Sequence, residues 1–252
     1  MNNLLFNTFI IGGIGFFSGW MGILAGIILS FFIKGRNRRL KGTVFGLIGG
    51  LMLAIVCFDI IPEAIEASNI YISSFGIVIG LLVSVLLEGK LDFSHIPSNS
   101  IDSNAFLKSG IFMAIAIGIH HLPIGFALGS LLSVHPIKGV HLAIAMILHG
   151  IPEGLALGMF FNNSKMGLYS LILISILTSL PMGIGAILGG IISEVSPSII
   201  SLSLAFSGGM ILYIILSETI PNAREIWRGR LSTIGIVIGI IIGTLIISFY
   251  AK

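Results

Sequence analysis

Eight long apolar stretches divide the chain and constrain its fold more than any other feature. Each is close to the ~20 residues that an α-helix needs to cross a bilayer. Only 9% of the residues are charged, against roughly 25% in soluble domains. We therefore predict an all-α polytopic membrane protein, a single transmembrane domain over residues 1–252. Its spans are predicted at about 6–33, 42–62, 70–88, 106–132, 139–161, 167–192, 200–221 and 231–250.

Lysine and arginine are distributed unevenly among the connections between these spans. Eleven of the thirteen lie in the first, third, fifth and seventh connections, and only Lys138 and Lys252 lie elsewhere. The positive-inside rule places those four connections in the cytoplasm and both termini outside. The polar segment 89–105 is then a cytoplasmic linker. Because this topology accounts for the net charge of +3, we expect the lipid bilayer and no nucleic acid as a partner.

Two ten-residue segments inside the fourth and fifth predicted spans, 120–129 and 149–158, are near copies of each other. The first begins His-His-Leu-Pro and the second His-Gly-Ile-Pro-Glu. Ionisable side chains are expensive in hydrocarbon and usually mark a pathway or a binding site. A repeated motif that is broken by proline in each copy is typical of a transporter whose site lies near the midplane.

The residue types in these motifs favour a divalent metal site. His149 and Glu153 are four residues apart and share one helix face. Imidazole and carboxylate suit zinc and other first-row divalent ions, and His120 supplies a further nitrogen. Single histidines in membrane helices more often bond to a neighbouring helix, but two such motifs with the one mid-membrane acid favour a metal. Asp59 is the first candidate for balancing the remaining charge. His121 ranks lower because adjacent helical residues point about 100° apart.

A second internal repeat pairs the ends of the second and seventh spans. Asp59 and Glu218 each precede a proline by three residues, and the two spans cross in opposite directions. This is the pattern of an inverted repeat that relates the first three spans to the last three. We predict Asp59 and His141 as pathway groups on the outer side and Glu218 as one on the inner side. Glu63 is predicted as a further gate or pathway residue. The alternative is that acids at span ends simply face headgroups or water.

These motifs resemble the ZIP family of divalent metal transporters, and its bacterial GufA-like branch most closely. The resemblance covers all eight spans and rests on three segments: His149-x-x-Pro-Glu-Gly, His120-His-x-Pro, and Asp59-x-x-Pro-Glu63-Ala. It implies a 3+2+3 helix arrangement and a metal site between the fourth and fifth spans. It also implies a transport domain that moves against a dimerising scaffold. The resemblance thus predicts a homodimer in a bacterial plasma membrane. The ion moved toward the cytoplasm would be Zn²⁺, Fe²⁺, Mn²⁺, Cd²⁺ or Co²⁺, with no prosthetic group.

The sequence departs from the family pattern at several positions. His121 and Ile124 stand where the family usually has asparagine and glutamate, and Gly150 stands where it often has a polar ligand. Met182 occupies a position that commonly carries glutamate in the family, and we predict that it lies on the ion pathway. These departures predict one bound ion in place of two, held mainly by the fifth span.

Two other functions are compatible with a buried His/Glu site. A membrane-embedded zinc hydrolase would need a general base beside the metal, and no second mid-membrane carboxylate is apparent. A metal sensor that does not transport would need a signalling domain, which the sequence does not show.

Overall fold

The computed structural model describes residues 2–90, 103–164, 166–192 and 195–250, and every regular element within these ranges is helical. Most of the predicted linker 89–105 lies outside the described residues. The elements are α1 (Asn2–Phe31), α2 (Arg38–Ile55), η1 (Val56–Ile60), α3 (Ile61–Ala67), α4 (Ile70–Lys90), α5 (Ser103–Val134), α6 (Pro136–Asn163), α7 (Leu168–Ile192), α8 (Pro197–Ile214), η2 (Ile215–Thr219), α9 (Ile220–Ile226) and α10 (Arg230–Tyr250).

Among the described residues, eight helical segments are long and apolar enough to cross a membrane, as predicted. Two of them are composite. The second runs through α2, η1 and α3 to Ala67, and the seventh runs through α8, η2 and α9 to Ile226. Both helices therefore continue past the predicted ends at 62 and 221, because the prolines there do not stop them.

A single widened turn carries each of these helices past its proline. Proline has no N–H, and its ring clashes with the carbonyl four residues earlier. In η1 and η2 the backbone is π-helical, so that Ile61 N–H donates to Val56 O and Ile220 N–H donates to Ile215 O, five residues back. Such π-bulges are frequent at functional sites. They place Asp59 and Glu218 in equivalent turns of the two halves.

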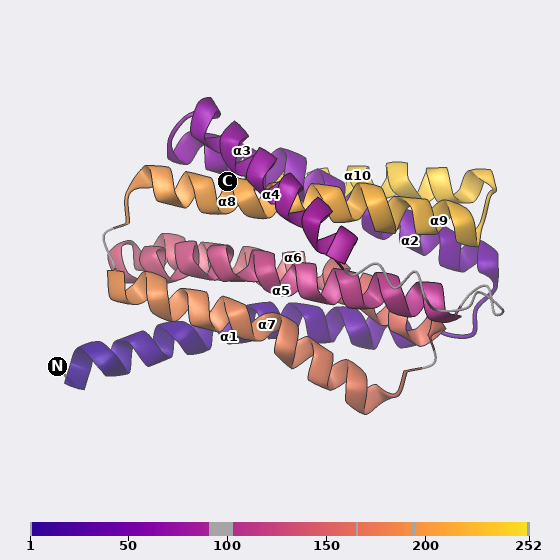
Figure 1. The fold of residues 1–252 in the computed structure, drawn as a ribbon, viewed down its shortest axis with the longest axis horizontal. Coiled ribbons are helices and arrows are strands. Elements are labelled where there is room, and N and C mark those ends of the chain that lie inside the picture. Colours follow the sequence, from indigo (N-terminus) through magenta and orange to yellow (C-terminus); the bar gives the residue numbers. More distant parts are fainter. Residues whose placement is uncertain (1, 91–102, 165, 193–194, 251–252) are drawn as a thin grey trace.

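The middle two spans in the sequence also lie in the middle of the bundle. In Figure 1, α5 and α6 run between α1 and α7 on one side and α2, α4, α8 and α10 on the other. The helix pairs of one half correspond to helix pairs of the other half. The contact of α1 with α6 corresponds to that of α7 with α5, and the contact of α2 with α10 corresponds to that of α8 with α4. This is the 3+2+3 arrangement.

Close glycine contacts show the register of the inverted repeat. Gly50 on α2 meets the carbonyl of Ile236 on α10, and Gly209 on α8 meets the carbonyl of Ile77 on α4. Both partners shift by 159 positions, from 50 to 209 and from 77 to 236. Because the related spans are an odd number of crossings apart, the repeat is inverted, as Asp59 and Glu218 predicted.

The two central helices carry an equivalent pair of contacts, in which the outer partners are again 159 positions apart and the glycines are 29 apart. Gly125 on α5 meets the carbonyl of Met182 on α7, and Gly154 on α6 meets the carbonyl of Ile23 on α1. A side chain at either glycine would collide with backbone, so small residues are needed for this close approach. The motif-bearing helices α5 and α6 are thus each fastened to an outer helix.

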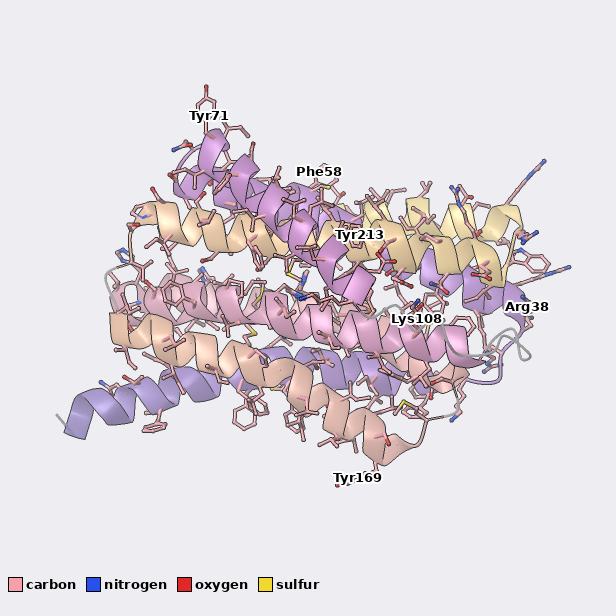
Figure 2. All side chains as sticks on the ribbon, viewed as in Figure 1. Arg38, Phe58, Tyr71, Lys108, Tyr169 and Tyr213 are labelled. Carbon is pink, nitrogen blue, oxygen red and sulfur yellow. The ribbon has the colours of Figure 1, made fainter. Side chains whose placement is uncertain are left out.

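Connections that the sequence predicts on opposite sides lie at opposite ends of the bundle. Figure 2 shows Arg38 and Lys108 toward one end and Tyr71 toward the other. The first and third connections therefore share an end, as the distribution of basic residues predicts. Which end faces the cytoplasm stays a prediction.

The glycine packing makes a prediction about stability. In Gly154→Ala the added methyl group collides with the carbonyl oxygen of Ile23, and overpacking of this kind costs about 1–3 kcal/mol. Thermal unfolding in detergent should show a lower midpoint for this variant. Gly13→Ala is the control, because its added methyl group meets no atom within 4 Å beyond the adjacent backbone of its own helix. Equal midpoints for the two variants would contradict the packing account.

Candidate metal centre

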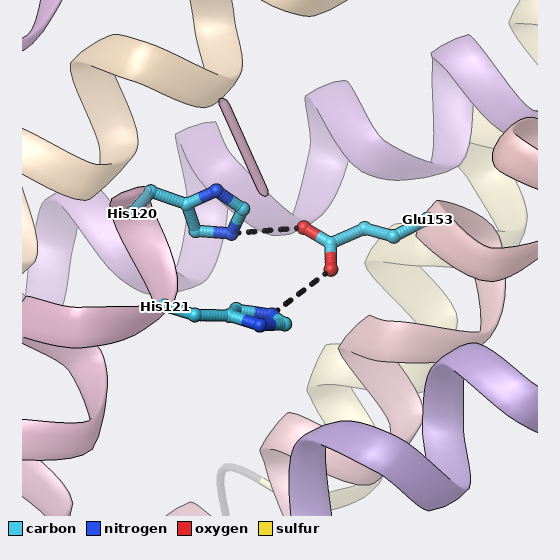
Figure 3. Close-up of side chains that lie close together, drawn as sticks. All are labelled: His120, His121 and Glu153. Atoms are coloured by element: carbon cyan, nitrogen blue, oxygen red, sulfur yellow. Dashed lines mark ion pairs between the residues drawn. The ribbon is translucent and has the colours of Figure 1, made fainter. Parts of the chain in front are cut away.

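Three buried side chains converge between α5 and α6 (Figure 3). His120 and His121 come from α5 and Glu153 comes from α6, and each is at most 2% exposed. His120 Nε2 lies 3.1 Å from Glu153 Oε1, and His121 Nε2 lies 3.3 Å from Glu153 Oε2. One ligand atom from each residue lies within 4.8 Å of the other two. Two imidazoles and a carboxylate therefore form a compact donor set in the apolar interior.

Hydrogen bonds on the far side of each ring determine which nitrogen carries the proton. His120 Nδ1 lies 3.0 Å from Ala116 O, and His121 Nδ1 lies 2.9 Å from Thr178 O. Because a carbonyl oxygen only accepts, Nδ1 is the donor, and Nε2 of the neutral ring keeps its lone pair. A histidine that binds a metal usually donates its other ring nitrogen in this way. Both Nε2 lone pairs are thus available on the side of Glu153.

Acceptors facing acceptors in a buried site require a positive charge between them, supplied by a bound cation or by a proton on one imidazole. Neither oxygen of Glu153 makes a hydrogen bond of ordinary geometry within the described part of the chain. Leaving such groups unpaired is costly. Tetrahedral zinc with bonds of about 2.0–2.2 Å separates neighbouring ligand atoms by about 3.3–3.5 Å. The 3.1 and 3.3 Å separations from His120 and His121 are close to that value.

His149 adds a third imidazole beside this set. Its Nε2 lies 3.0 Å from Glu153 Oε1, one helical turn along α6, and the side chain is 1% exposed. Neither ring nitrogen makes a hydrogen bond to any described residue. The pairing of His149 with Glu153 on one helix face agrees with the spacing in the sequence. It stands slightly apart from the compact set of His120, His121 and Glu153.

The structure changes the relative weight of the two adjacent histidines. His121 was ranked low because neighbouring helical residues diverge, yet both rings reach the same carboxylate, one at each oxygen (Figure 3). Their centroids are 4.7 Å apart. Glu153 can meet both diverging rings because its two carboxylate oxygens are separate, and each faces one ring. The centre therefore draws equally on the fourth and fifth spans, and not mainly on the fifth as expected.

Prolines interrupt the hydrogen bonding of α5 and α6 at the two motifs, and a serine of α8 binds the motif on α5. Pro123 and Pro152 lie inside α5 and α6, where they deprive the carbonyls of Ile119 and Leu148 of a helical donor. Ser207 on α8 donates a hydrogen bond of 2.9 Å to the carbonyl of His120. Sequence reasoning missed Ser207, and also Thr178, whose carbonyl orients His121. A small polar residue within an apolar span was the signal available for Ser207. Thr178 acts through its backbone carbonyl, so its residue type gave no signal.

The other predicted site residues lie outside this set. Asp59, half-buried in η1, interacts electrostatically with His149. Glu218, half-buried in η2, accepts a 3.2 Å hydrogen bond from Asn222 and interacts with Lys108.

Glu63 and His141 are exposed, on α3 and near the start of α6. His141 lies two turns before the buried His149 and is exposed, as a residue nearer the mouth of the site would be. Met182 is fully buried on α7 in an apolar cluster that includes Ile124. The pathway roles of these three residues stay predictions.

Comparisons with known proteins agree with this fold and centre. The family model ZIP Zinc transporter matches residues 96–250, more than half of the chain. The Zinc transporter ZupT of Chlorobaculum parvum is 27% identical over 238 residues, which cover 86% of this chain and 89% of the relative. Those of Akkermansia muciniphila and Campylobacter jejuni are 30% and 28% identical over 129 and 140 residues.

The latter two matches cover 42% and 40% of this chain and 48% of each relative, so they span about half the length of those proteins. The GufA-like branch stays a prediction. The family match, the eight spans and the buried donor set lead to one assignment. The chain belongs to the ZIP zinc transporter family.

Proposed function

We propose that this protein carries divalent transition-metal ions, zinc first among them, across the membrane toward the cytoplasm. The observation that carries the proposal is the buried centre in which two imidazole lone pairs and a carboxylate converge without hydrogen bonds between them. Family membership and the names of the relatives support zinc as the substrate. Fe²⁺, Mn²⁺, Cd²⁺ and Co²⁺ suit the same nitrogen and oxygen donors.

Charge balance explains why more than one acid is needed near the ion. A divalent cation bound by neutral imidazoles and Glu153 keeps about one uncompensated positive charge, and a central charge costs roughly 2.5–3.5 kcal/mol or more in a bilayer. Asp59 interacts electrostatically with His149 and so lies where its charge offsets the remainder. Glu153 therefore acts as a ligand, while the negative charge of Asp59 stabilises the ion electrostatically without binding it.

The arrangement of helices supports movement of a group that includes the centre. α5 and α6 are fastened by glycine contacts to α7 and α1, whereas α2 is fastened to α10 and α4 to α8. Ser207 on α8 reaches across to α5 through one hydrogen bond. In this proposal α1, α5, α6 and α7 move as a transport domain against the remaining helices. Those helices form the scaffold through which two copies of the chain dimerise.

Transport is favoured over the two alternatives. The family and the relatives are transporters by name, which argues against a hydrolase. Within the described residues Glu153 is the only carboxylate of the compact donor set, so a hydrolase would lack a general base distinct from its metal ligand. A sensor without transport has no observation that specifically favours it.

The placement of the chain follows from this function. We place it in the bacterial plasma membrane with both termini outside. Lys108 then lies on the cytoplasmic side, and its interaction with Glu218 supports a role for that acid where the ion leaves. Asp59 and Glu63 lie in the equivalent position of the other half, where the ion arrives.

The ligand role of Glu153 can be tested by flux. Zinc uptake into proteoliposomes should fall by at least about 10-fold in Glu153→Gln, because the amide keeps the shape of the side chain but loses the anionic oxygens. Loss of a hydrogen-bond partner of a metal ligand already costs about 10–100-fold, and Glu153 is a ligand itself. Glu225→Gln, at an exposed acid on α9, is the matched control and should transport like wild type. Uptake by Glu153→Gln at the wild-type rate would remove the centre from the pathway.

The two acids in the π-helical turns generate a separate prediction. Asp59→Asn and Glu218→Gln should each slow uptake more than they weaken zinc binding, since neither residue belongs to the compact donor set. Asp59→Asn should also weaken binding somewhat, because it removes the charge that offsets the ion. Equilibrium binding and flux measured on the same preparations separate the two effects. If both variants transport like wild type, the acids are merely solvated helix residues.

A further inference from the structure

Two basic connections that are far apart in the sequence meet at one end of the bundle. Arg38, which begins α2, donates a 3.1 Å hydrogen bond from Nε to the carbonyl of Ile226, the last residue of α9. The guanidinium carbon of Arg39 lies 4.9 Å from the ring centroid of Trp227. Figure 2 shows Arg38 at this end. The basic surface so formed consists of six exposed side chains: Lys34, Arg36, Arg38, Arg39, Arg228 and Arg230.

No acid balances the positive charge of the basic surface. Neither connection, 32–37 or 227–229, contains aspartate or glutamate. Arg36 and Arg38 each donate a hydrogen bond to a backbone carbonyl. Within the described part of the chain, none of the five arginines pairs with a carboxylate, that of the neighbouring Glu225 included. Because a guanidinium group is a planar fork of donors that matches phosphate oxygens, the surface suits a phosphate-bearing anion.

The basic surface lies where the apolar part of the bundle ends. The second span begins at Arg38, the seventh ends at Ile226 and the eighth begins at Arg230. Trp227, between the last two, is half-buried, and Gly42 of α2 packs against its side chain. Its indole N–H donates to no described residue. Tryptophan is enriched at the headgroup level of a bilayer, where its ring is in apolar surroundings and its N–H meets polar groups.

Exposed apolar side chains adjoin the basic surface along the chain. Phe32, Leu40 and Leu231 are 72%, 43% and 41% exposed, and each lies within two residues of a member of the surface. A soluble phosphate would contact the guanidinium groups and leave these side chains in water. A phospholipid would contact the arginines through its headgroup and cover the apolar side chains with its acyl chains. The combination favours a lipid as the occupant.

We propose that the basic surface is a binding site for an anionic phospholipid, whose phosphate is held by arginines of both connections beside Trp227. The bound lipid joins the start of α2 to the connection between α9 and α10, within the helices assigned to the scaffold. In the orientation proposed above, the surface faces the cytoplasmic leaflet, whose negative charge attracts basic residues next to a span. The site is separate from the metal centre, so its failure would leave transport standing.

Tryptophan fluorescence can test this site, because the chain contains only two tryptophans, Trp20 and Trp227. Trp20→Phe keeps an aromatic ring beside Phe16, on which Trp20 stacks, and leaves Trp227 as the single fluorophore. The full-length variant is placed in phosphatidylcholine vesicles that contain either brominated phosphatidylglycerol or brominated phosphatidylcholine at the same mole fraction. Bromine quenches nearby indole rings. Quenching should give a binding constant at least about fivefold higher for phosphatidylglycerol than for phosphatidylcholine.

Charge substitutions in the same background separate a specific site from general attraction. Arg39→Gln and Arg228→Gln should each lower the preference for phosphatidylglycerol severalfold, up to about fivefold. Lys138→Gln is the matched control, since Lys138 is an exposed cation in the first turn of α6, at the other end of the bundle, and should leave the preference unchanged. Quenching by brominated phosphatidylcholine should be the same in all variants, which shows that Trp227 keeps its place.

Three results would overturn the lipid site. The first is equal quenching by the two brominated lipids in the Trp20→Phe protein. The second is a loss of preference in Lys138→Gln as large as in the arginine variants, because the attraction would then be a property of the whole surface. The third is reversal of the excess quenching by glycerol phosphate in solution, because the occupant would then be a soluble phosphate.

Discussion

The structure depends on one electrostatic requirement: a buried carboxylate faced by nitrogen lone pairs must have a positive charge between them, either a metal ion or a proton on one ring. His120 and His121 have their Nδ1 protons committed to backbone carbonyls, so their Nε2 atoms face Glu153 as acceptors. In water such an arrangement would be solvated, but here all three side chains are buried. A metal ion satisfies the lone pairs at separations close to those of a tetrahedral ligand shell. The centre is preorganised for an ion and unfavourable without a positive charge.

The fold holds that centre by repeating one packing device around it. Glycines bring α5 against α7 and α6 against α1. Two further glycine contacts, related to each other by a shift of 159 positions, bring α2 against α10 and α8 against α4. Backbone contact of this kind resists separation of the helices within a pair. The hydrogen bond from Ser207 to His120 connects the two sets of helices at the centre itself. The residue that binds the ion, His120, is therefore also the residue that contacts the second set of helices.

Much of this could be predicted from the sequence, because the bilayer imposes strong rules. Span length, the distribution of basic residues and the cost of ionisable groups in hydrocarbon predicted the eight helices and identified His149 and Glu153. The similarity of Asp59 and Glu218 predicted the inverted repeat. These inferences depend on residue type and spacing alone, which the sequence contains in full.

The parts that were missed depend on tertiary contacts. Helical geometry placed His121 away from His120, but could not show that one carboxylate with two oxygens meets both. The π-helical turns arise from how the backbone accommodates Pro62 and Pro221, where a helix end was equally plausible. The carbonyl of Thr178 reaches His121 from another span, 57 positions away in the chain.

The central claim is that a divalent ion binds between the Nε2 atoms of His120 and His121 and the carboxylate of Glu153. Crystals grown with zinc and measured on both sides of its absorption edge test this most directly. The account predicts an anomalous peak about 2.0–2.2 Å from all three side chains. Zinc located elsewhere in the molecule, with no peak at this cluster, would contradict it.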